Sequence, residues 1–172
     1  MFTRLIFWGA VHCAAALYPA QASWAADTTQ LEISGTLIKP PCTASFPLTQ
    51  SVEVPKVNLN SLRAGVTDWT DVALNFQCTK GSRVQITFTS GRGAFDSGTM
   101  RTTSNQLGLA TRLSDVTTTV RPLEMNFGEP QIFAVKDAAL NLKFSVRPVI
   151  ASEQLPTLGT FSATLMMEVV YL

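Results

Sequence analysis

The sequence predicts an all-β fold in which short antiparallel strands form two packed sheets. Apolar and polar residues alternate along most of the chain, and apolar residues at helical spacing never continue for three turns. Glycine, proline and polar clusters separate the alternating stretches, as turns do. No segment of about 20 to 50 residues recurs, which excludes propellers and solenoids. About seven such strands in a chain of 172 residues favour an immunoglobulin-like β-sandwich.

The composition is that of one folded domain. The chain is 46% hydrophobic and 15% charged, which excludes an intrinsically disordered polypeptide. Its 13 basic side chains nearly balance 12 acidic ones, so the formal net charge is +1. A chain so close to neutrality has no basic excess with which to displace the counterions of a nucleic acid. We therefore expect no nucleic-acid partner.

The first 25 residues predict a signal peptide. Arg4 precedes a mostly apolar run over residues 5–17, which is shorter than the roughly 20 residues of a membrane-spanning helix. Small residues follow, and we expect cleavage after Ala25, with Ala22 as the alternative. Residues 1–25 would then direct export, and we expect no stable membrane insertion of the mature chain.

Cleavage would also limit the chemistry of the mature chain. It removes the only histidine, His12, and one of the three cysteines, Cys13. A Ser-His-Asp triad and a Cys-His pair are then impossible, and neighbouring carboxylates are most simply explained as solvated surface. We expect no catalytic residue, no metal site and no cofactor.

The two remaining cysteines, Cys42 and Cys78, predict a disulfide. An exported chain passes through an oxidising compartment, where such a pair usually becomes bonded. The bond would close a loop of about 37 residues and contribute roughly 4 kcal/mol in the chain-entropy model. Two buried free thiols are the alternative, and they fit that compartment less well.

The middle of the chain predicts six strands. Residues 48–57 predict one, interrupted near Pro55. Residues 72–78 and 84–88 alternate on either side of the turn-like residues 79–82, which predicts a hairpin.

Further strands are predicted later in the chain. They cover residues 107–113 and 123–127, the latter following a proline that favours an edge or a strand start, and residues 140–146. A helical turn over residues 107–112 is an alternative to the first of these.

The two ends of the mature chain alternate most regularly. Leu31, Ile33, Gly35 and Leu37 share one register near its start, and a glycine there lets a partner surface approach closely. Near the end, six apolar residues occupy one face of a predicted strand: Phe161, Ala163, Leu165, Met167, Val169 and Tyr171. Ordinary first and last strands of a complete sandwich are the alternative for both segments.

These ends resemble one family. Residues 29–43, TQLEISGTLIKPPCT, resemble the amino-terminal segment of chaperone–usher pilins, the subunits of type 1 and P-type fimbriae. Gly159, Phe161, Ala163 and Tyr171 resemble the carboxyl-terminal motif of that family, whose disulfide the two cysteines match in order and spacing. The Pro-Pro-Cys-Thr junction is closest to minor subunits of the fibre tip.

The resemblance implies an incomplete immunoglobulin-like β-sandwich, the pilin fold, that a donor strand from another protein completes. Residues 26–38 would form an amino-terminal donor-strand extension, and residues 39–172 would form the pilin domain. The donor positions would be Thr29, Leu31, Ile33, Gly35 and Leu37. The acceptor groove, which also binds the chaperone, would be lined by Phe161, Ala163, Leu165, Met167, Val169, Tyr171 and Leu172.

The same resemblance implies partners and a location. A periplasmic chaperone would lend a strand and bind the carboxylate of Leu172, and the outer-membrane usher would exchange that strand for one of a neighbouring fimbrial subunit. The chain would pass through the periplasm to the cell-surface fimbrium and contribute to cell adhesion, with a minor tip adaptor as the finer expectation. The alternative is a self-sufficient secreted immunoglobulin-like binding module, lectin-like in function. Trp69 could stack on a sugar in such a module, although core packing explains it more simply.

Overall fold

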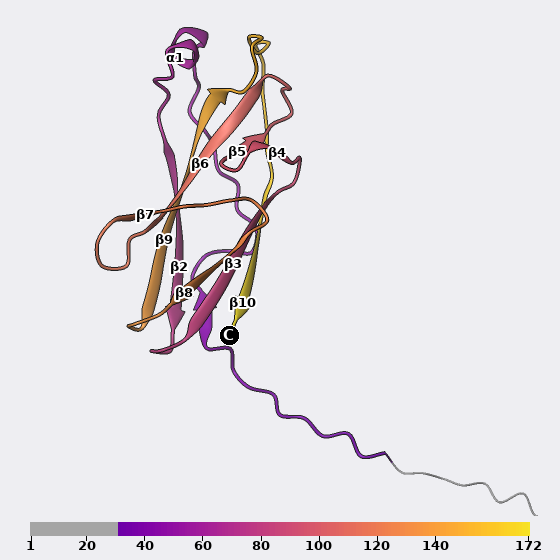
Figure 1. The fold of residues 1–172 in the computed structure, drawn as a ribbon, viewed down its shortest axis with the longest axis vertical. Coiled ribbons are helices and arrows are strands. Elements are labelled where there is room, and N and C mark those ends of the chain that lie inside the picture. Colours follow the sequence, from indigo (N-terminus) through magenta and orange to yellow (C-terminus); the bar gives the residue numbers. More distant parts are fainter. Residues whose placement is uncertain (1–30) are drawn as a thin grey trace, which may run out of the picture. The chain divides into compact units, whose positions relative to one another are not determined.

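The computed structural model describes residues 31–172, most of which form two antiparallel sheets (Figure 1). The signal peptide predicted for residues 1–25 and the donor position Thr29 lie outside the described residues. The chain divides after Leu37, and every helix and strand that the structure describes belongs to the unit Ile38–Leu172.

The larger sheet contains seven strands, of which the longest, β9, is paired along both of its sides. Its order is β1 (Cys42–Ala44), β2 (Thr70–Cys78), β9 (Ala139–Ile150), β6 (Leu107–Asp115), β5 (Thr99–Arg101) and β4 (Ala94–Asp96), with β7 (Arg121–Leu123) also paired to β6. The strands predicted at residues 72–78, 107–113 and 140–146 are confirmed, and the helical-turn alternative is excluded.

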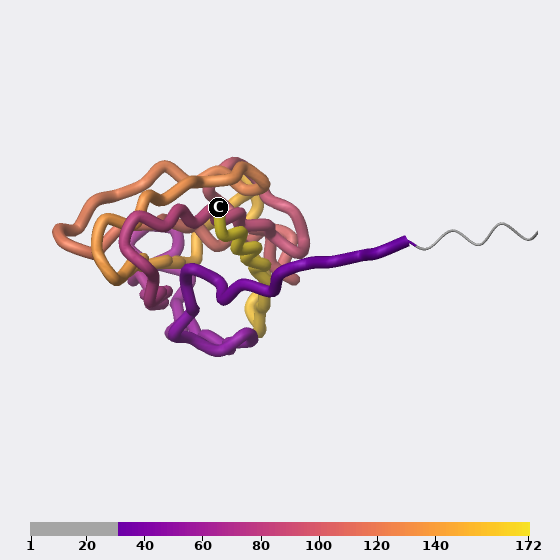
Figure 2. The backbone as a smooth tube through the Cα atoms, turned by 90° about the horizontal axis from the view of Figure 1, so that it is seen from below, coloured from indigo at the N-terminus to yellow at the C-terminus, as the bar shows by residue number. Residues whose placement is uncertain are grey.

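The smaller sheet has three strands in the order β10 (Leu165–Tyr171), β3 (Arg83–Ser90) and β8 (Pro130–Ala134). It forms the second layer in Figure 1, and β10 leads to the carboxyl terminus at the near end of the view in Figure 2. The one helix among the described residues, α1 (Leu59–Arg63), is capped by the Asn58 side chain, which accepts a hydrogen bond from the Ser61 amide at 2.8 Å.

The core lies between the two sheets because strand alternation turns one face of each sheet inward. The larger sheet supplies Phe76, Leu113 and Leu142, and the smaller one supplies its central strand β3. Phe88 on β3 stacks on Phe144 of β9 with ring centres 5.5 Å apart, so the two layers meet directly.

The hairpin predicted from residues 72–78 and 84–88 is wrong. Both strands exist, but β2 belongs to the larger sheet and β3 to the smaller. One edge of β2 is occupied by β1 and the other by β9, so the turn carries the chain across the core. The turn amides of Thr79 and Gly81 donate to the carbonyls of Pro41 (2.7 Å) and Val135 (2.9 Å).

Two other strand predictions need correction. Residues 48–57 form no strand, and Leu48 is fully exposed; Pro55, which has no amide hydrogen to donate to a ladder, lies in this segment. The strand predicted at residues 123–127 is instead β7, which ends at Leu123. Gly128 with φ +81° turns the chain soon afterwards.

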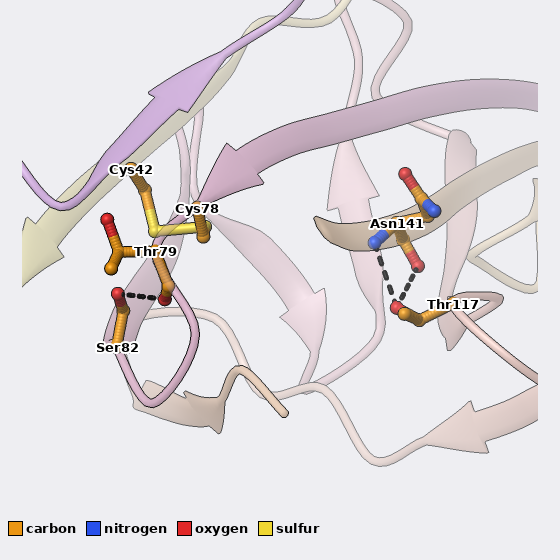
Figure 3. Close-up of a disulfide and its surroundings, with 6 residues drawn as sticks. All are labelled: Cys42, Cys78, Thr79, Ser82, Thr117 and Asn141. Atoms are coloured by element: carbon orange, nitrogen blue, oxygen red, sulfur yellow. Dashed lines mark hydrogen bonds between the residues drawn. A yellow bond between two sulfur atoms is a disulfide. The ribbon is translucent and has the colours of Figure 1, made fainter. Parts of the chain in front are cut away.

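The structure joins Cys42 to Cys78 in a disulfide, as the sequence predicted (Figure 3). The two residues are register partners in β1 and β2, and Cys42 is 1% exposed. The bond therefore ties the first strand of the sandwich to the end of β2, next to the turn in which the Ser82 hydroxyl donates to the Thr79 carbonyl.

Candidate functional site

The last strand of the chain lies at an open edge of the smaller sheet. β10 pairs along its length with β3, from Leu165 opposite Ser90 to Tyr171 opposite Val84. On its other side, β10 has no strand partner among residues 31–172. An unpaired edge of this kind presents backbone donors and acceptors to which a further strand can add.

The apolar face of this edge is only half covered. The six alternating apolar residues predicted from the sequence share one face and are all partly buried against the core: Phe161, Ala163, Leu165, Met167, Val169 and Tyr171. Residues between them face solvent, and Met166 is 53% exposed. By contrast, the core residues of β3, such as Ile86 at 0%, are completely buried.

The alternating segment forms a regular strand only from Leu165 onward. Residues before it are held by isolated hydrogen bonds, from the Thr103 amide to the Ser162 carbonyl (2.9 Å) and from the Gly91 amide to the Thr164 carbonyl (2.8 Å). A Cβ atom at Gly91 would approach the Thr164 Cβ to 3.2 Å. The glycine therefore allows the segment to pass close to the end of β3.

A second set of half-buried apolar residues was not predicted from the sequence. Ala44, Phe46 and Val54 pack against the same core, and the ring of Phe46 meets that of Phe76 edge-on at 5.2 Å. The chain between β1 and α1, which contains Phe46 and Val54, runs beside the carboxyl-terminal segment in Figures 1 and 2. The sequence analysis predicted a strand over residues 48–57, but Phe46 and Val54 reach the core from irregular backbone.

The predicted donor residues carry apolar side chains in full contact with solvent. Leu31, Ile33 and Leu37 are 80%, 85% and 101% exposed, and residues 31–37 form no helix or strand. A Cβ atom added at Gly35 would have nothing within 4 Å. Exposed apolar residues in alternation are costly in water and are typical of a segment that another surface covers.

Trp69 does not pack in the core, contrary to the simpler explanation given above. It is half-buried, and the guanidinium carbons of Arg112 and Arg147 lie 4.2 Å and 4.8 Å from the centre of its ring. Beside it, the hydroxyl of Ser145 donates to Asp71 at 2.6 Å, which lowers the pKa of that carboxyl, as do Lys143 and Arg112.

The described residues contain no cluster of histidine, cysteine, aspartate and glutamate that could hold a metal ion. No helix in the same part of the chain is long and apolar enough to span a membrane.

Comparison with known proteins agrees with this architecture. The family model described as "Fimbrial protein" matches residues 31–171, whereas curated protein sequences give no significant match. The P pilus rod subunit PapA is similar in structure with a TM-score of 0.53 and 21% identity, over 77% of this chain and 99% of PapA. A chain from the structure of a chaperone–usher pilus has a TM-score of 0.60 and 20% identity, over 85% of this chain and 96% of that one.

The likeness to these two solved structures shows that the fold is the incomplete immunoglobulin-like β-sandwich of pilins. Members of the matched family are structural subunits of surface pili, so the chain is not an enzyme. Because the family model covers almost all of the described residues, the chain belongs to the fimbrial protein family and is a fimbrial subunit.

Proposed function

We propose that this subunit polymerises by donor-strand exchange, accepting a strand beside β10 and lending residues 26–38 to a neighbouring subunit. The observation that carries the proposal is the open edge of β10 with its half-covered apolar row. A bare edge of this hydrophobicity would promote aggregation. A donated strand removes that liability by pairing with the edge and covering the row.

On the acceptor side, an added strand would place alternate side chains over the face of β10. The groove would be lined by Phe161, Ala163, Leu165, Met167, Val169, Tyr171 and Leu172. Backbone hydrogen bonds would supply affinity, while the side-chain alternation would fix the register, because a slip of one residue would turn every apolar side chain outward.

On the donor side, Leu31, Ile33 and Leu37 would enter a neighbour's groove. Burying three such side chains at roughly 2 kcal/mol each gives about 6 kcal/mol before the cost of ordering the segment. Gly35 would sit where the two backbones approach most closely. Thr29 is small and polar, so it would contribute least at the outer end.

A periplasmic chaperone would occupy the edge first, and the outer-membrane usher would then exchange its strand for that of another subunit. The carboxylate of Leu172 suits capture by a basic group of the chaperone. The amide of Leu172 already donates to the Arg83 carbonyl at 3.0 Å, and the residue remains 54% exposed.

We further propose a minor adaptor position near the fibre tip, from which the subunit contributes to cell adhesion. The short Pro-Pro-Cys-Thr junction at the start of β1 favours this position over the shaft. Crosslinking of assembled fibres followed by mass spectrometry would identify the flanking subunits. Crosslinks to further copies of this chain along the shaft would contradict the adaptor position.

Expression in a periplasm with and without the cognate chaperone tests the main proposal. We expect degradation or aggregation without the chaperone, and rescue by the chaperone or by a peptide with the sequence of a donor strand. A stable soluble monomer in the absence of any partner would contradict the proposal and favour a self-sufficient binding module.

A further inference from the structure

Two arginines lie against one tryptophan on the larger sheet. Arg112 and Arg147 both place their guanidinium carbon within 5 Å of the centre of the Trp69 ring, at 4.2 Å and 4.8 Å. Trp69 directly precedes β2, Arg147 lies on β9 and Arg112 on β6, so the contact spans three adjacent strands. Stacking on an aromatic ring orients a guanidinium without using its hydrogen-bond donors.

The charge of this arginine–tryptophan cluster (Trp69, Arg112 and Arg147) is poorly balanced. The nearest ion-pairing carboxylate, Asp71, accepts from Ser145 at 2.6 Å and pairs with Lys143 at 3.1 Å, whereas Arg112 is 3.9 Å away. Among the described residues Arg147 has no ion pair, and its Nε atom is buried without a partner. The buried Nε of Arg147 is closed to a ligand, so an anionic ligand would use the terminal Nη groups, of which only that of Arg112 makes an ion pair among the described residues.

Polar amides continue the same face of the sheet. Asn75 of β2 and Asn141 of β9 are register partners. Along the same two strands, the pair Ala73 and Lys143 lies two residues away, and the pair Asp71 and Ser145 lies four residues away. Figure 3 shows the backbone of Asn141 held by Thr117, with its side-chain amide pointing away from that contact. Such amides both donate and accept hydrogen bonds, as sugar hydroxyls require.

We propose that the arginine–tryptophan cluster binds an anionic polysaccharide through its carboxylate or sulfate groups. Guanidinium forks match such oxyanions with paired hydrogen bonds. Two forks fixed on one ring suit a polymer that carries anionic groups at repeated intervals. The amides of Asn75 and Asn141 lie six residues, about 20 Å, further along the strands from Trp69 and Arg147, so they suit the hydroxyls of a more distant sugar unit of the same polymer. The cluster and β10 lie in different sheets, so strand donation at β10 would not cover it. This inference rests on the proposed function for its role in adhesion.

Binding can be measured with three polymers that share one backbone: dextran sulfate, carboxymethyl dextran and unmodified dextran. The full mature chain is titrated in the form in which it is recovered, alone or with its chaperone. We expect binding to at least one charged dextran, with the two charged polymers distinguishing sulfate from carboxylate recognition, and none to unmodified dextran. Binding to neither charged polymer, or equal binding to unmodified dextran, would overturn the proposal. Polyglutamate binding as tightly as the charged dextrans would overturn the assignment to a polysaccharide.

Matched variants locate the site. We expect Arg112→Gln and Arg147→Gln each to weaken binding about tenfold, the effect of losing a charged hydrogen-bond donor. Asp71→Asn should strengthen binding, because it removes the carboxylate that competes for Arg112. Arg101→Gln is the control, since Arg101 stacks on Phe95 at 4.1 Å and carries the same charge outside the cluster.

Two results would contradict the assignment of binding to this cluster. A loss with Arg101→Gln equal to that of the cluster variants, or weaker binding with Asp71→Asn in a folded protein, would overturn the assignment. Thermal melting of each variant identifies unfolded protein. Because the titration does not require polymerisation, failure of donor-strand exchange and failure of polysaccharide binding give separate results.

Discussion

Met167 on β10 and Phe88 on β3 lie opposite each other in register, yet they differ in burial. Phe88 is 2% exposed, whereas Met167 is only half-buried. The reason is their place in the sheet, because among residues 31–172 β3 has a strand on both sides and β10 has a strand on one side. A strand added beside β10 would make the two environments alike.

Leu165→Glu should abolish recovery of the chaperone-bound subunit. The substitution would place a charge in the half-buried row of β10, where a donated strand would have to desolvate it. Met166→Glu is the matched control, because Met166 is the next residue along, faces solvent and is 53% exposed. Co-purification with the chaperone measures the effect. Equal recovery of the two variants would count against the proposed groove.

Ile33→Arg should block assembly at the donor end while leaving chaperone binding intact, and Leu31→Arg should do the same. Either arginine would have to enter an apolar groove without a partner for its charge. Ser34→Arg changes the alternate register, which would point away from a groove, and serves as control. The ladder of polymers formed with a neighbouring subunit provides the measurement. Normal polymerisation of both donor variants would refute the assignment.

Replacing Cys42 and Cys78 together by serine should lower the free energy of unfolding under oxidising conditions. The bond closes a loop of about 37 residues, for which the chain-entropy model gives roughly 4 kcal/mol, with about 2 kcal/mol as a typical lower value. Urea denaturation of the subunit bound to a donor-strand peptide measures the difference. If the parent and the double variant had the same urea midpoint of unfolding, the disulfide would have no stabilising role.

Acid should destabilise the sandwich partly through Asp71 and Asp115. The hydrogen bond from Ser145 is the largest influence on Asp71 and lowers its pKa. Burial alone would raise the pKa of Asp115, but Thr117 and Arg121 together outweigh burial, so the pKa of Asp115 is also lowered. A carboxyl whose pKa is lower in the folded state than in the unfolded state stabilises the folded state at pH values above the unfolded pKa. This contribution is lost as the pH falls through the folded pKa.

Asp71→Asn and Asp115→Asn should therefore flatten the fall in melting temperature between about pH 5 and about pH 2. Asp96→Asn provides a comparison variant for the same titration. Unchanged pH profiles in both test variants would show that neither carboxyl contributes to acid sensitivity.

Much of the fold follows from alternation alone. β2, β3 and β9 were predictable because apolar residues at alternate positions of each strand face a continuous core, and β6 because Leu107, Leu109 and Leu113 share one register. The pairing of β2 with β3 was mispredicted because a short polar turn suggests a hairpin by default. β1 and β9 occupy the two edges of β2. This pairing depends on the tertiary structure, so no local sequence pattern predicts it.

The candidate site was also predictable from the sequence only in part. The apolar row on β10 follows from strict alternation, but its partial burial depends on the absence of a partner strand, which only the sheet order among residues 31–172 shows. Phe46 was missed, and Val54 was assigned to a strand that does not exist, because both residues pack from irregular backbone. Trp69 was misplaced because the arginines that hold it come from β6 and β9, distant in sequence.

The disulfide also has a mechanical consequence. In a fibre under tension, force would enter each subunit through its leading segment and reach Cys42, the first residue of β1. The covalent bond to Cys78 passes that pull into β2, which is bonded along its length to β9. Stretching would then load many hydrogen bonds at once instead of peeling β1 away one bond at a time, so the reduced protein should yield at lower force.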